Sequence, residues 1–536
     1  MMVRHTALPV AALLALLTSS GAAQGRRGGT IASEPDLHAA AALITPDKAL
    51  QRLSVIADDS MGGRNTPSRG LELTAQYLAA NYRRWGLKPL GDSGTWFQRY
   101  TVQRLRPALN TSGMDVVEHG SRAHYTFGTW AIVSGPMTGK TIGGPVTIVA
   151  GAVTPGDIAP LDLHGAVVLF VSNGARAATN PLVTRALVAK APLAIITLDN
   201  GDAESFKARV ANALHDGGAR PAVKGVPLSG VLQIVAHDSL FGHDAVTLHH
   251  DFNSLRNADT PVIQPAVAGL TISLVATAEV VSSATAPNVV AVMESDDPVY
   301  RNEYVIFSAH MDHIGTAGDG VGGCTPKGAD SICNGADDDG SGTTGVLSIA
   351  EAVAALKGHT RRSVIFLNVS GEEKGLLGSA WFVNHPTVPL DLVVADINMD
   401  MISRNNPDSI VVIGKEHSDM GATLARVQSA HPELHLVAAD DIWPEQGFYA
   451  RSDHFNFARK GVPVLFFFNG IHAQYHQADD EVRLSDTSKL ARVATLGFYL
   501  GMDIATTTQR PKWNPQSYQT IVVDQLPPPI TVKKHP

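Results

Sequence analysis

The sequence predicts an α/β protein with a doubly wound central sheet, flanked by helices and interrupted by an inserted β-rich domain. From about residue 286 onward, nearly continuous apolar runs alternate with helical patterns, which is typical of a sheet covered on both faces. Between about 110 and 285 the pattern changes to short β-rich runs separated by Gly, Pro and Asp turns. These two observations together predict the fold class.

The first 23 residues have the order of a secretory signal peptide. A basic start precedes the apolar run from Ala7 to Leu17, and small residues follow as far as Ala23. A membrane anchor is the alternative, but this run is much shorter than the roughly 20 residues that span a bilayer. We therefore expect no membrane anchor and export to the periplasm or the medium. Residues 24–44 are small and polar, and we expect a frayed leader there.

We divide the rest of the chain into an N-terminal part at 40–110, an insertion at 111–284, a main domain at 285–510 and a C-terminal tail at 511–536. The insertion contains none of the clustered metal-type residues described below, so we expect it to shape access rather than to perform chemistry. Its β-rich runs lie at 145–150, 166–171 and 193–197.

Helices are predicted where apolar residues recur at spacings of three and four, and strands where apolar runs are short and continuous. The predicted helices are Pro46–Asp58, Gly70–Trp85, Gly345–Leu356, Gly375–Val383 and about Thr487–Ala505. The predicted strands of the main domain are Asn288–Met293, Tyr304–Ala309, Ser363–Val369, Leu392–Asn398, Ile410–Ile413 and Val462–Phe468.

Composition narrows the class of function. The chain has 536 residues, of which 44% are hydrophobic and 17% charged, which is ordinary for a folded protein of two or three domains. The net charge of −8 offers no basic face, so we expect no nucleic-acid partner.

The two cysteines, Cys324 and Cys333, lie in one Gly-rich loop. Export favours a disulfide between them, because disulfides persist in oxidising compartments. Their spacing matches no zinc–cysteine motif. Two free thiols are the alternative.

Six segments of the C-terminal half carry acidic residues or histidines that a pair of divalent metal ions could use. Several of them follow directly on a predicted strand, and strand ends are where open α/β sheets build their sites. The segments are His310-Met311-Asp312, Asp337-Asp338-Asp339, Glu372-Glu373, Asp400, Ser452-Asp453-His454 and Tyr475-His476. Chance would scatter such residues over the surface, so the pattern predicts a metal-dependent hydrolase.

The three adjacent aspartates at 337–339 lie on a Gly-rich turn, where they repel one another unless cations neutralise them. One carboxylate can bridge two metal ions that lie roughly 3.5–4 Å apart. A solvated loop with helix-capping aspartates is the alternative. A calcium loop is a further one, although the alternating Asp-x-Asp-x-Asp-Gly order is missing.

Glu372 and Glu373 follow a predicted strand and open the next predicted helix. Adjacent side chains at a strand end can diverge, so one glutamate can bind metal while its neighbour faces the attacking water. Capping of the helix N-terminus by acids is the alternative.

His310 and Asp400 each end a predicted strand. Asp312 lies two residues beyond His310 and can hold the second nitrogen of a ligating imidazole, although a strand-end histidine is also a common structural residue. An unpaired carboxylate in the apolar surroundings of Asp400 is costly.

Tyr475-His476 follows the last predicted strand, where His454 and His472 are competitors for the same role. Each of these segments has a structural alternative when it is taken alone. Because all of them fall on the same edge of one sheet, we favour a two-metal site.

In this order the motifs His-x-Asp, Asp-Asp-Gly-Ser-Gly, Glu-Glu, Asp-Met and Tyr-His resemble those of the M28 family of zinc exopeptidases, which includes secreted bacterial aminopeptidases. The resemblance covers about residues 285–508. The segment Gly70–Phe97 is similar to the first part of the same domain, and the insertion more loosely resembles a protease-associated domain. A doubly wound sheet of the zinc exopeptidase type is what the resemblance implies.

The resemblance also implies two Zn²⁺ ions per chain. His310 and Asp400 would hold one ion, Glu373 and His476 would hold the other, and Asp338 would bridge them. Manganese or cobalt could occupy the same ligands.

Three further residues receive catalytic roles from the resemblance. Glu372 would be the general base, Tyr475 would hydrogen-bond the tetrahedral intermediate, and Asp312 would orient the first histidine ligand. The reaction implied is hydrolysis of a peptide substrate at its N-terminal residue.

Three other functions compete with an aminopeptidase. A carboxypeptidase or dipeptidase on the same scaffold would need a cation for the substrate carboxylate, and Arg404 is a candidate. A glutaminyl cyclase would work with one catalytic zinc, whereas the intact ligand set favours two metals. A non-catalytic binding protein is the third, and the intact ligands argue against it. The oligomeric state stays open.

Overall fold

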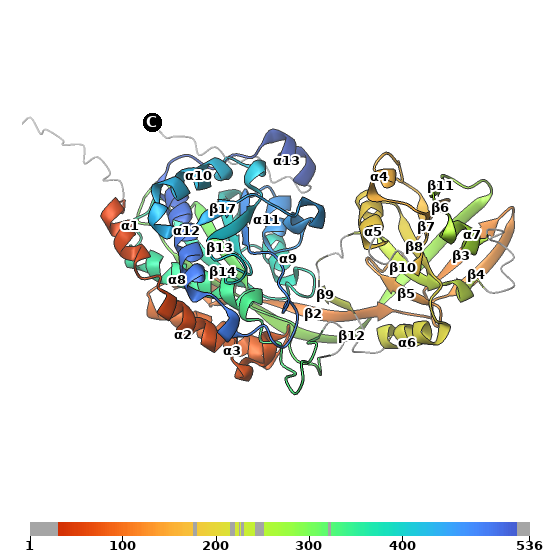
Figure 1. The fold of residues 1–536 in the computed structure, drawn as a ribbon, viewed down its shortest axis with the longest axis horizontal. Helices are drawn as coiled ribbons and strands as arrows, with labels where there is room; N and C mark the ends of the chain where they lie inside the picture. Colours follow the sequence, from red (N-terminus) through yellow and green to blue (C-terminus); the bar gives the residue numbers. More distant parts are fainter. Residues whose placement is uncertain are drawn as a thin grey trace, which may run out of the picture.

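The computed structural model describes residues 31–174, 180–214, 220–224, 226, 230–241, 251–319 and 323–522. These residues form two lobes joined by a long β-ribbon (Figure 1). The predicted signal peptide at 1–23 lies outside the described residues. No helix in the described part of the chain is both long and apolar enough to cross a membrane.

The larger lobe is built on a twisted central sheet. Four neighbouring strands at its centre, in the order β14, β13, β15, β18, are parallel, with β12 antiparallel at one side and β16 antiparallel at the other. The strands are β12 (Leu270–Met293), β13 (Tyr304–His310), β14 (Ser363–Val369), β15 (Val393–Met399), β16 (Ser409–Ile413) and β18 (Val464–Phe468), with the short strands β1 (Lys88–Pro89) and β17 (Val437–Ala439) at the margins.

Helices cover both faces of this sheet, so the predicted doubly wound α/β sheet is confirmed. One face carries α1 (Glu34–Ala41), α2 (Pro46–Ile56), α3 (Arg69–Arg84), α8 (Gly342–Ala355), α10 (Met420–Ala430) and α12 (Thr487–Thr506). The other face carries α9 (Leu377–Asn384) and α11 (His454–Arg459).

Alternation along the strands explains why both faces are covered. On β13, Val305 and Phe307 point into the core beneath α8 and α12, whereas Ile306 points into the core beneath α9 and α11. All three side chains are fully buried. A strand that is apolar at every position must bury both faces, and the nearly continuous apolar runs of the sequence reflect this.

The parallel strands bring the predicted site residues to one edge of the sheet. His310 is the last residue of β13, Asp400 follows β15, and Glu372 and Glu373 follow β14. His476 lies beyond the end of β18. Because parallel strands end on the same side of a sheet, residues up to 166 positions apart in the sequence converge there.

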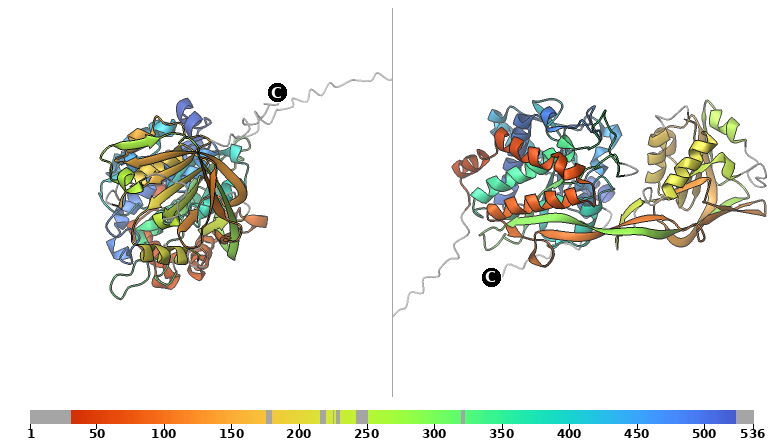
Figure 2. Two further views of the ribbon diagram at one scale, coloured as in Figure 1. Left: turned by 90° about the vertical axis from the view of Figure 1, so that its right-hand side faces the viewer. Right: turned by 90° about the horizontal axis from the view of Figure 1, so that it is seen from below.

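The smaller lobe is formed by the residues that lie between β2 (Phe97–Pro107) and β12 in the sequence. These two strands pair with each other along β2 and form the connecting ribbon (Figure 2). The smaller lobe has its own core, separate from that of the larger lobe. Six of its strands are β5 (Ala131–Ser134), β6 (Thr138–Gly151), β7 (Val167–Val171), β8 (Ala194–Asp199), β10 (Leu232–His237) and β11 (Pro261–Gln264). The others are β3 (Gly113–Glu118), β4 (Ser121–Thr126) and β9 (Arg220–Val223), which pairs with β2.

The smaller lobe is not purely β-rich. The helices α5 (Asn180–Ala189) and α6 (Ala203–Leu214) accompany its parallel strands β6, β7, β8 and β10, alongside the shorter α4 (Pro155–Ile158) and α7 (Phe252–Asn257). Sequence analysis found the strands, because they are continuous apolar runs. It did not identify the helices.

The expectation of a frayed leader over 24–44 is wrong for part of that range, because residues 34–41 form α1. The Oγ of Ser33 and the Asp36 carboxylate close a capping box, with a hydrogen bond of 2.6 Å from Oγ to Oδ2. Packing of α1 on α8 and α12 then holds the helix. At the other end, α13 (Pro515–Ile521) is also helical, and Trp513 just before it donates its indole N–H to the carbonyl of Gly461.

Candidate metal centre

The first group of ligand-type atoms lies where β13 and β15 end. The Nε2 of His310 is 3.3 Å from Oδ1 of Asp338 and 3.5 Å from Oδ1 of Asp400. All three residues are buried. Three atoms of this kind within 4.8 Å of one another could hold a single metal ion.

A second group faces the other oxygen of Asp338. The Nε2 of His476 is 3.2 Å from Oδ2 of Asp338 and 3.1 Å from Oε2 of Glu373. His476 has a φ of 58°, which non-glycine residues seldom adopt. Contacts with the surrounding structure must therefore hold its backbone in this conformation. Asp338 therefore presents one carboxylate oxygen to each group.

The distances between the ligand-type atoms fit tetrahedral coordination of a metal ion. Ligand atoms that lie about 2.0–2.2 Å from a shared zinc ion are separated by about 3.3–3.6 Å along the edges of the tetrahedron. The four separations, 3.1, 3.2, 3.3 and 3.5 Å, lie close to this range. In addition, Nε2 of His476 is buried without a hydrogen-bond partner among the described residues. The donor set is imidazole and carboxylate, which suits zinc.

The three adjacent aspartates divide into one that faces both groups and two that hold the loop. Asp337 accepts hydrogen bonds from the Oγ and N–H of Ser403, both of 2.7 Å. Asp339 accepts the backbone N–H groups of His310, Gly342 and Met401. Only Asp338 keeps both of its oxygens directed at the metal-type residues.

Asp480 fixes the backbone of this loop, and sequence analysis missed it. Its Oδ2 accepts the N–H groups of Asp337 and Asp338, at 3.0 and 3.2 Å. Asp480 lies in Ala-Asp-Asp-Glu just after His476, so the only available signal was one more acidic residue in an acidic stretch. Ser452, whose Oγ donates to Oδ2 of Asp400 at 2.8 Å, was noticed only as a neighbour of a competing histidine.

Arg64 is a second residue that sequence analysis missed. It is fully buried and donates to the backbone carbonyls of Ile56, Met311 and Gly335 at 2.9–3.0 Å. It therefore holds together the two ends of the long connection between β13 and α8, at Met311 just after β13 and at Gly335 shortly before α8. Its signal in the sequence is weak, because a single arginine after two glycines resembles an ordinary exposed turn.

Asp312 contacts His310 chiefly through its backbone. The Nδ1 of His310 lies 3.2 Å from the carbonyl oxygen of Asp312 and 3.7 Å from its Oδ1. The Asp312 carboxylate itself accepts the hydroxyl of Thr66 at 2.9 Å and the N–H of Glu372 at 3.3 Å. Asp312 thus links the strand end that carries His310 to the loop that carries Glu372.

Glu372 and Tyr475 line one cavity together with the first group of ligand atoms. The cavity is bordered by His310, Asp338, Glu372, Asp400, Met401, Phe448, Arg451, Phe466, Phe468, Ile471 and Tyr475. Burial raises the pKa of Glu372 well above its usual value, and the neighbouring Glu373 adds to the shift, against the opposing effect of His310. The expectation that Glu372 opens a helix is wrong, because α9 begins only at Leu377.

The two competing histidines lie elsewhere. The His454 ring stacks on Phe466 with centroids 4.5 Å apart, and burial lowers its pKa to about 3. The Nε2 of His472 lies 3.4 Å from Oδ2 of Asp337, on the loop-holding side of the aspartate run. Neither shares a group of ligand atoms with Asp338 within the described residues.

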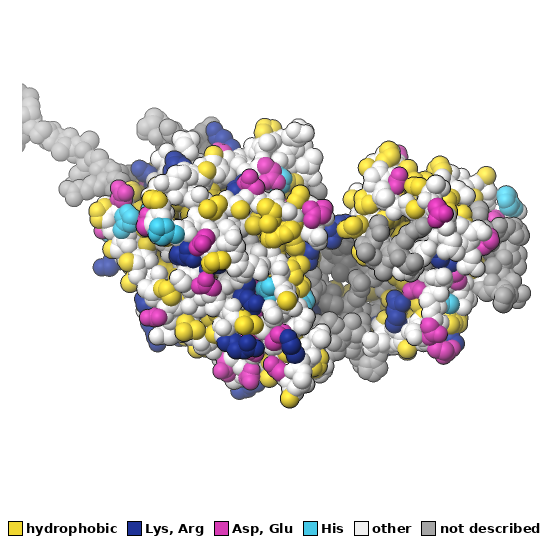
Figure 3. All heavy atoms as spheres, viewed as in Figure 1, with side chains coloured by type: hydrophobic (Ala, Val, Ile, Leu, Met, Phe, Trp, Pro, Cys, Tyr) yellow, Lys and Arg dark blue, Asp and Glu magenta, His cyan; other side chains and the backbone are white. Residues whose placement is uncertain are grey.

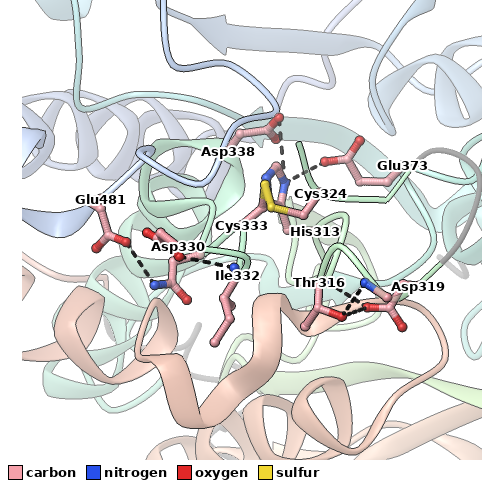
Figure 4. The surroundings of a disulfide bond; sticks show 12 residues. His313, Thr316, Asp319, Cys324, Asp330, Ile332, Cys333, Asp338, Glu373 and Glu481 are labelled. Carbon is pink, nitrogen blue, oxygen red and sulfur yellow. Dashed lines mark hydrogen bonds and ion pairs between the residues drawn. A yellow bond between two sulfur atoms is a disulfide. The ribbon is translucent and has the colours of Figure 1, made fainter. Parts of the chain in front are cut away.

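The predicted disulfide between Cys324 and Cys333 is present (Figure 4). Both cysteines are buried and pack with Ile314 and Ala478. Ile314 follows His313, and Ala478 lies two residues after His476. The disulfide therefore packs against residues next to His313 and His476.

The main lobe also matches known proteins. The model of Peptidase family M28 matches residues 288–500, the segment that carries all of the ligand-type residues above. We call this segment the M28 domain, after the family that it matches. Its motifs, in the order His310, Asp338, Glu372-Glu373, Asp400 and His476, are those on which the resemblance rested.

The relatives of the M28 domain include two fungal proteins described as probable leucine aminopeptidases. That of Arthroderma benhamiae is 28% identical over 206 residues, covering 36% of this chain and 54% of the relative. That of Arthroderma otae is 31% identical over 211 residues, covering 37% and 53%. The chain thus spans about half the length of these relatives.

Among solved structures, the aminopeptidase from Aneurinibacillus sp. strain AM-1 superposes with a TM-score of 0.48 at 17% sequence identity. The match covers 89% of this chain and 98% of that protein.

Removal of the disulfide should loosen the M28 domain at the second ligand group. Closing a loop of nine residues stabilises a fold by about 2–3 kcal/mol in the chain-entropy account. We expect the double variant Cys324→Ser/Cys333→Ser to lose about this much unfolding free energy and to bind zinc more weakly. Denaturant unfolding with and without zinc measures both effects. Unchanged zinc binding in a destabilised variant would show that the disulfide does not position His476.

Zinc uptake should release protons. Burial lowers the pKa of His476, but the neighbouring carboxylates of Asp338 and Glu373 outweigh it and raise the pKa to about 10. In metal-depleted protein His476 is therefore protonated at pH 8, and zinc must displace that proton, so affinity should rise with pH up to about 10. Calorimetric titration in two buffers of different ionisation enthalpy counts the protons. His476→Gln should release about one proton fewer, and equal release would contradict the assignment.

Proposed function

We propose that the chain is an exported di-zinc aminopeptidase that removes N-terminal residues from peptides. The observation that carries the proposal is the division of the Asp338 carboxylate between two groups of ligand atoms beside one cavity. A two-metal hydrolase requires a carboxylate that can bridge two sets of metal ligands, and Asp338 lies between two such sets. The disulfide and the fungal relatives of the M28 domain support export and peptide hydrolysis.

In this proposal His310 and Asp400 hold one zinc ion, Glu373 and His476 hold the other, and Asp338 bridges them. Each ion then has three protein ligands, which leaves coordination positions for water and substrate. When bound, the two ions supply Lewis acidity that acidifies water and polarises a carbonyl group.

Glu372 is the proposed general base. Its carboxylate lines the cavity, and burial together with Glu373 favours its protonated form, so it can keep a proton once it has taken one from water. The same carboxyl group then returns the proton to the leaving amine. The N–H of Glu372 is held by Oδ1 of Asp312 at 3.3 Å, which fixes the base relative to His310.

Tyr475 is the proposed donor to the developing oxyanion. Burial raises its pKa, and the charges of Asp338 and Glu373 raise it further. The phenol therefore stays protonated and can donate its hydroxyl hydrogen throughout the pH range of catalysis. Its ring stacks on His476 with centroids 3.8 Å apart, so it is packed directly against a proposed ligand.

The cavity also indicates which side chain would be accepted. Besides the ligand residues, Glu372, Arg451 and Tyr475, it is lined by apolar side chains, from Met401, Phe448, Phe466, Phe468 and Ile471. A pocket with this apolar part suits an apolar residue at the substrate N-terminus. The names of the two fungal relatives point to the same preference.

We further propose that residues 111–284 form an inserted domain that shapes access to the cavity. Arg185, on α5 of this lobe, donates to the carbonyl of Gln446 at 2.8 Å. Gln446 lies two residues before Phe448 and five before Arg451, which both border the cavity. The larger lobe faces the smaller one across a notch (Figure 3), and on the face shown Lys and Arg side chains are scattered among acidic ones.

A carboxypeptidase or dipeptidase is the second candidate, and the position of Arg451 favours it. This side chain borders the cavity, and its guanidinium lies 4.6 Å from the centre of the Phe448 ring. Arg404, the cation expected from the sequence, is instead bound to Gln474 at 2.7 Å and lies near Asp480.

Glu372→Gln should abolish turnover while leaving zinc content intact, because the amide keeps the shape but cannot accept the proton. We expect a loss of at least 10²-fold in kcat, in line with the contribution of a general base. Metal analysis of the same preparation gives the zinc content. Glu416→Gln, at an exposed position outside the cavity, is the matched control. If Glu372→Gln kept nearly wild-type activity, Glu372 would not be the general base.

Peptides that differ only at their ends separate the two candidate functions. An aminopeptidase should cleave Leu-Gly-Gly with a free amine, tolerate a blocked carboxyl end and fail when the amine is acetylated. It should also prefer N-terminal Leu or Phe to Asp by at least tenfold in kcat/KM. Cleavage that survives acetylation but needs the free carboxylate would make the enzyme a carboxypeptidase, and Arg451→Ala should then raise KM.

A further inference from the structure

His313 contacts the second ligand group without taking a place in the proposed ligand set. Its side chain is fully buried, and its Nδ1 lies 2.6 Å from Oε1 of Glu373 (Figure 4). The other oxygen of Glu373, Oε2, lies 3.1 Å from His476. The two oxygens of this carboxylate are therefore divided between two histidines.

The distances separate the roles of these two histidines. Two ligands of one zinc ion lie about 3.3–3.6 Å apart, and the separation between His476 and Oε2 is close to that range. A separation of 2.6 Å is too short for two ligands of one tetrahedral ion and is that of a close ion pair instead, although His313, Asp338 and Glu373 also offer ligand atoms within 4.8 Å of one another. The Nδ1 of His313 also lies 3.8 Å from Oδ2 of Asp338, beyond that range.

The His313 ring is held firmly in this position. A Cβ atom added at Gly335 would lie 2.5 Å from the ring, so the glycine gives the imidazole its room against the loop that carries Asp338. The N–H of His313 is bonded to the carbonyl of Arg64 at 3.3 Å. On the other side, the ring meets that of His476 edge-on, with centroids 5.6 Å apart.

We propose that His313 is a positioning residue that holds Oε1 of Glu373, so that Glu373 offers only Oε2 to its metal ion. The inference rests on the proposed function, because it needs a metal at the second ligand group. A carboxylate that is free to turn can bind an ion through both oxygens, which fills a coordination position that substrate or water requires. Partners of ligating carboxylates also fix ligand geometry, and their loss costs 10–100-fold in metal affinity.

The two variants His313→Asn and His313→Leu test this directly. Asparagine places an amide N–H close to where Nδ1 stands, whereas leucine has nearly the same shape and no donor. Zinc titration against a competing chelator measures both binding steps in wild type and variants. We expect one step to weaken 10–100-fold in His313→Leu, the other step to stay unchanged, and His313→Asn to recover most of the loss.

Cobalt substitution distinguishes positioning from direct ligation. If His313 were a ligand, both variants would change the visible d–d absorption of the second cobalt ion, and asparagine would not restore it. Equal affinity of His313→Leu and wild type for both ions would overturn the inference, and so would loss of a ligand band in both variants. His385→Leu, which alters an exposed histidine stacked on Trp381, is the control for loss of an imidazole elsewhere.

The wild-type titration separates this inference from the proposed function. If wild type binds two zinc ions and only the His313 variants behave unexpectedly, the positioning role fails and the two-metal assignment stands. If wild type binds fewer than two ions, the proposed function itself fails. Thermal unfolding of the metal-depleted variants shows whether they are folded, and His313→Asn carries the test if His313→Leu is not.

Discussion

The division of one buried carboxylate between two groups of ligand atoms is the constraint on which the rest of the main lobe depends. Asp338 presents Oδ1 to His310 and Oδ2 to His476, within a concentration of buried acids that would repel one another. Backbone N–H groups, buried histidines and the clamp made by Arg64 offset part of that repulsion. Under the proposed function, two divalent cations offset the rest.

The sheet supplies this arrangement at little local cost. Four parallel strands end at one edge, and a proposed ligand or catalytic side chain ends β13, follows β15 directly, and lies within four residues of the end of β14 and eight of the end of β18. The loop around Asp338 is the exception, because it must turn three adjacent aspartates in different directions. It does so through side-chain and backbone contacts from distant segments, with Ser403 on Asp337 and Asp480 on the N–H groups of Asp337 and Asp338.

The residues around the ligands connect regions that lie far apart in sequence. Thr66 reaches Asp312 from the turn before α3, and Asp312 in turn holds the N–H of Glu372. The disulfide packs against Ile314 and Ala478, and so ties the His313 segment to the His476 segment. On the outside, Arg185 of the smaller lobe holds the rim at Gln446. The proposed metal ligands are thus supported from within the larger lobe, and the smaller lobe contacts only the rim of the cavity.

The sequence by itself predicted the doubly wound sheet and most of the strands and helices of the main lobe, because apolar periodicity is a local property. The roles proposed for eight residues came from the resemblance of their motifs to those of the M28 family. The sequence also indicated the disulfide. Only the tertiary structure showed that Arg404 is already paired, and that His313, Arg64 and Asp480 surround the ligands. Those facts depend on contacts between segments tens to hundreds of residues apart, and no local pattern encodes them. The short helix α1 was missed for the same reason, because its packing on α8 and α12 outweighs its weak apolar pattern.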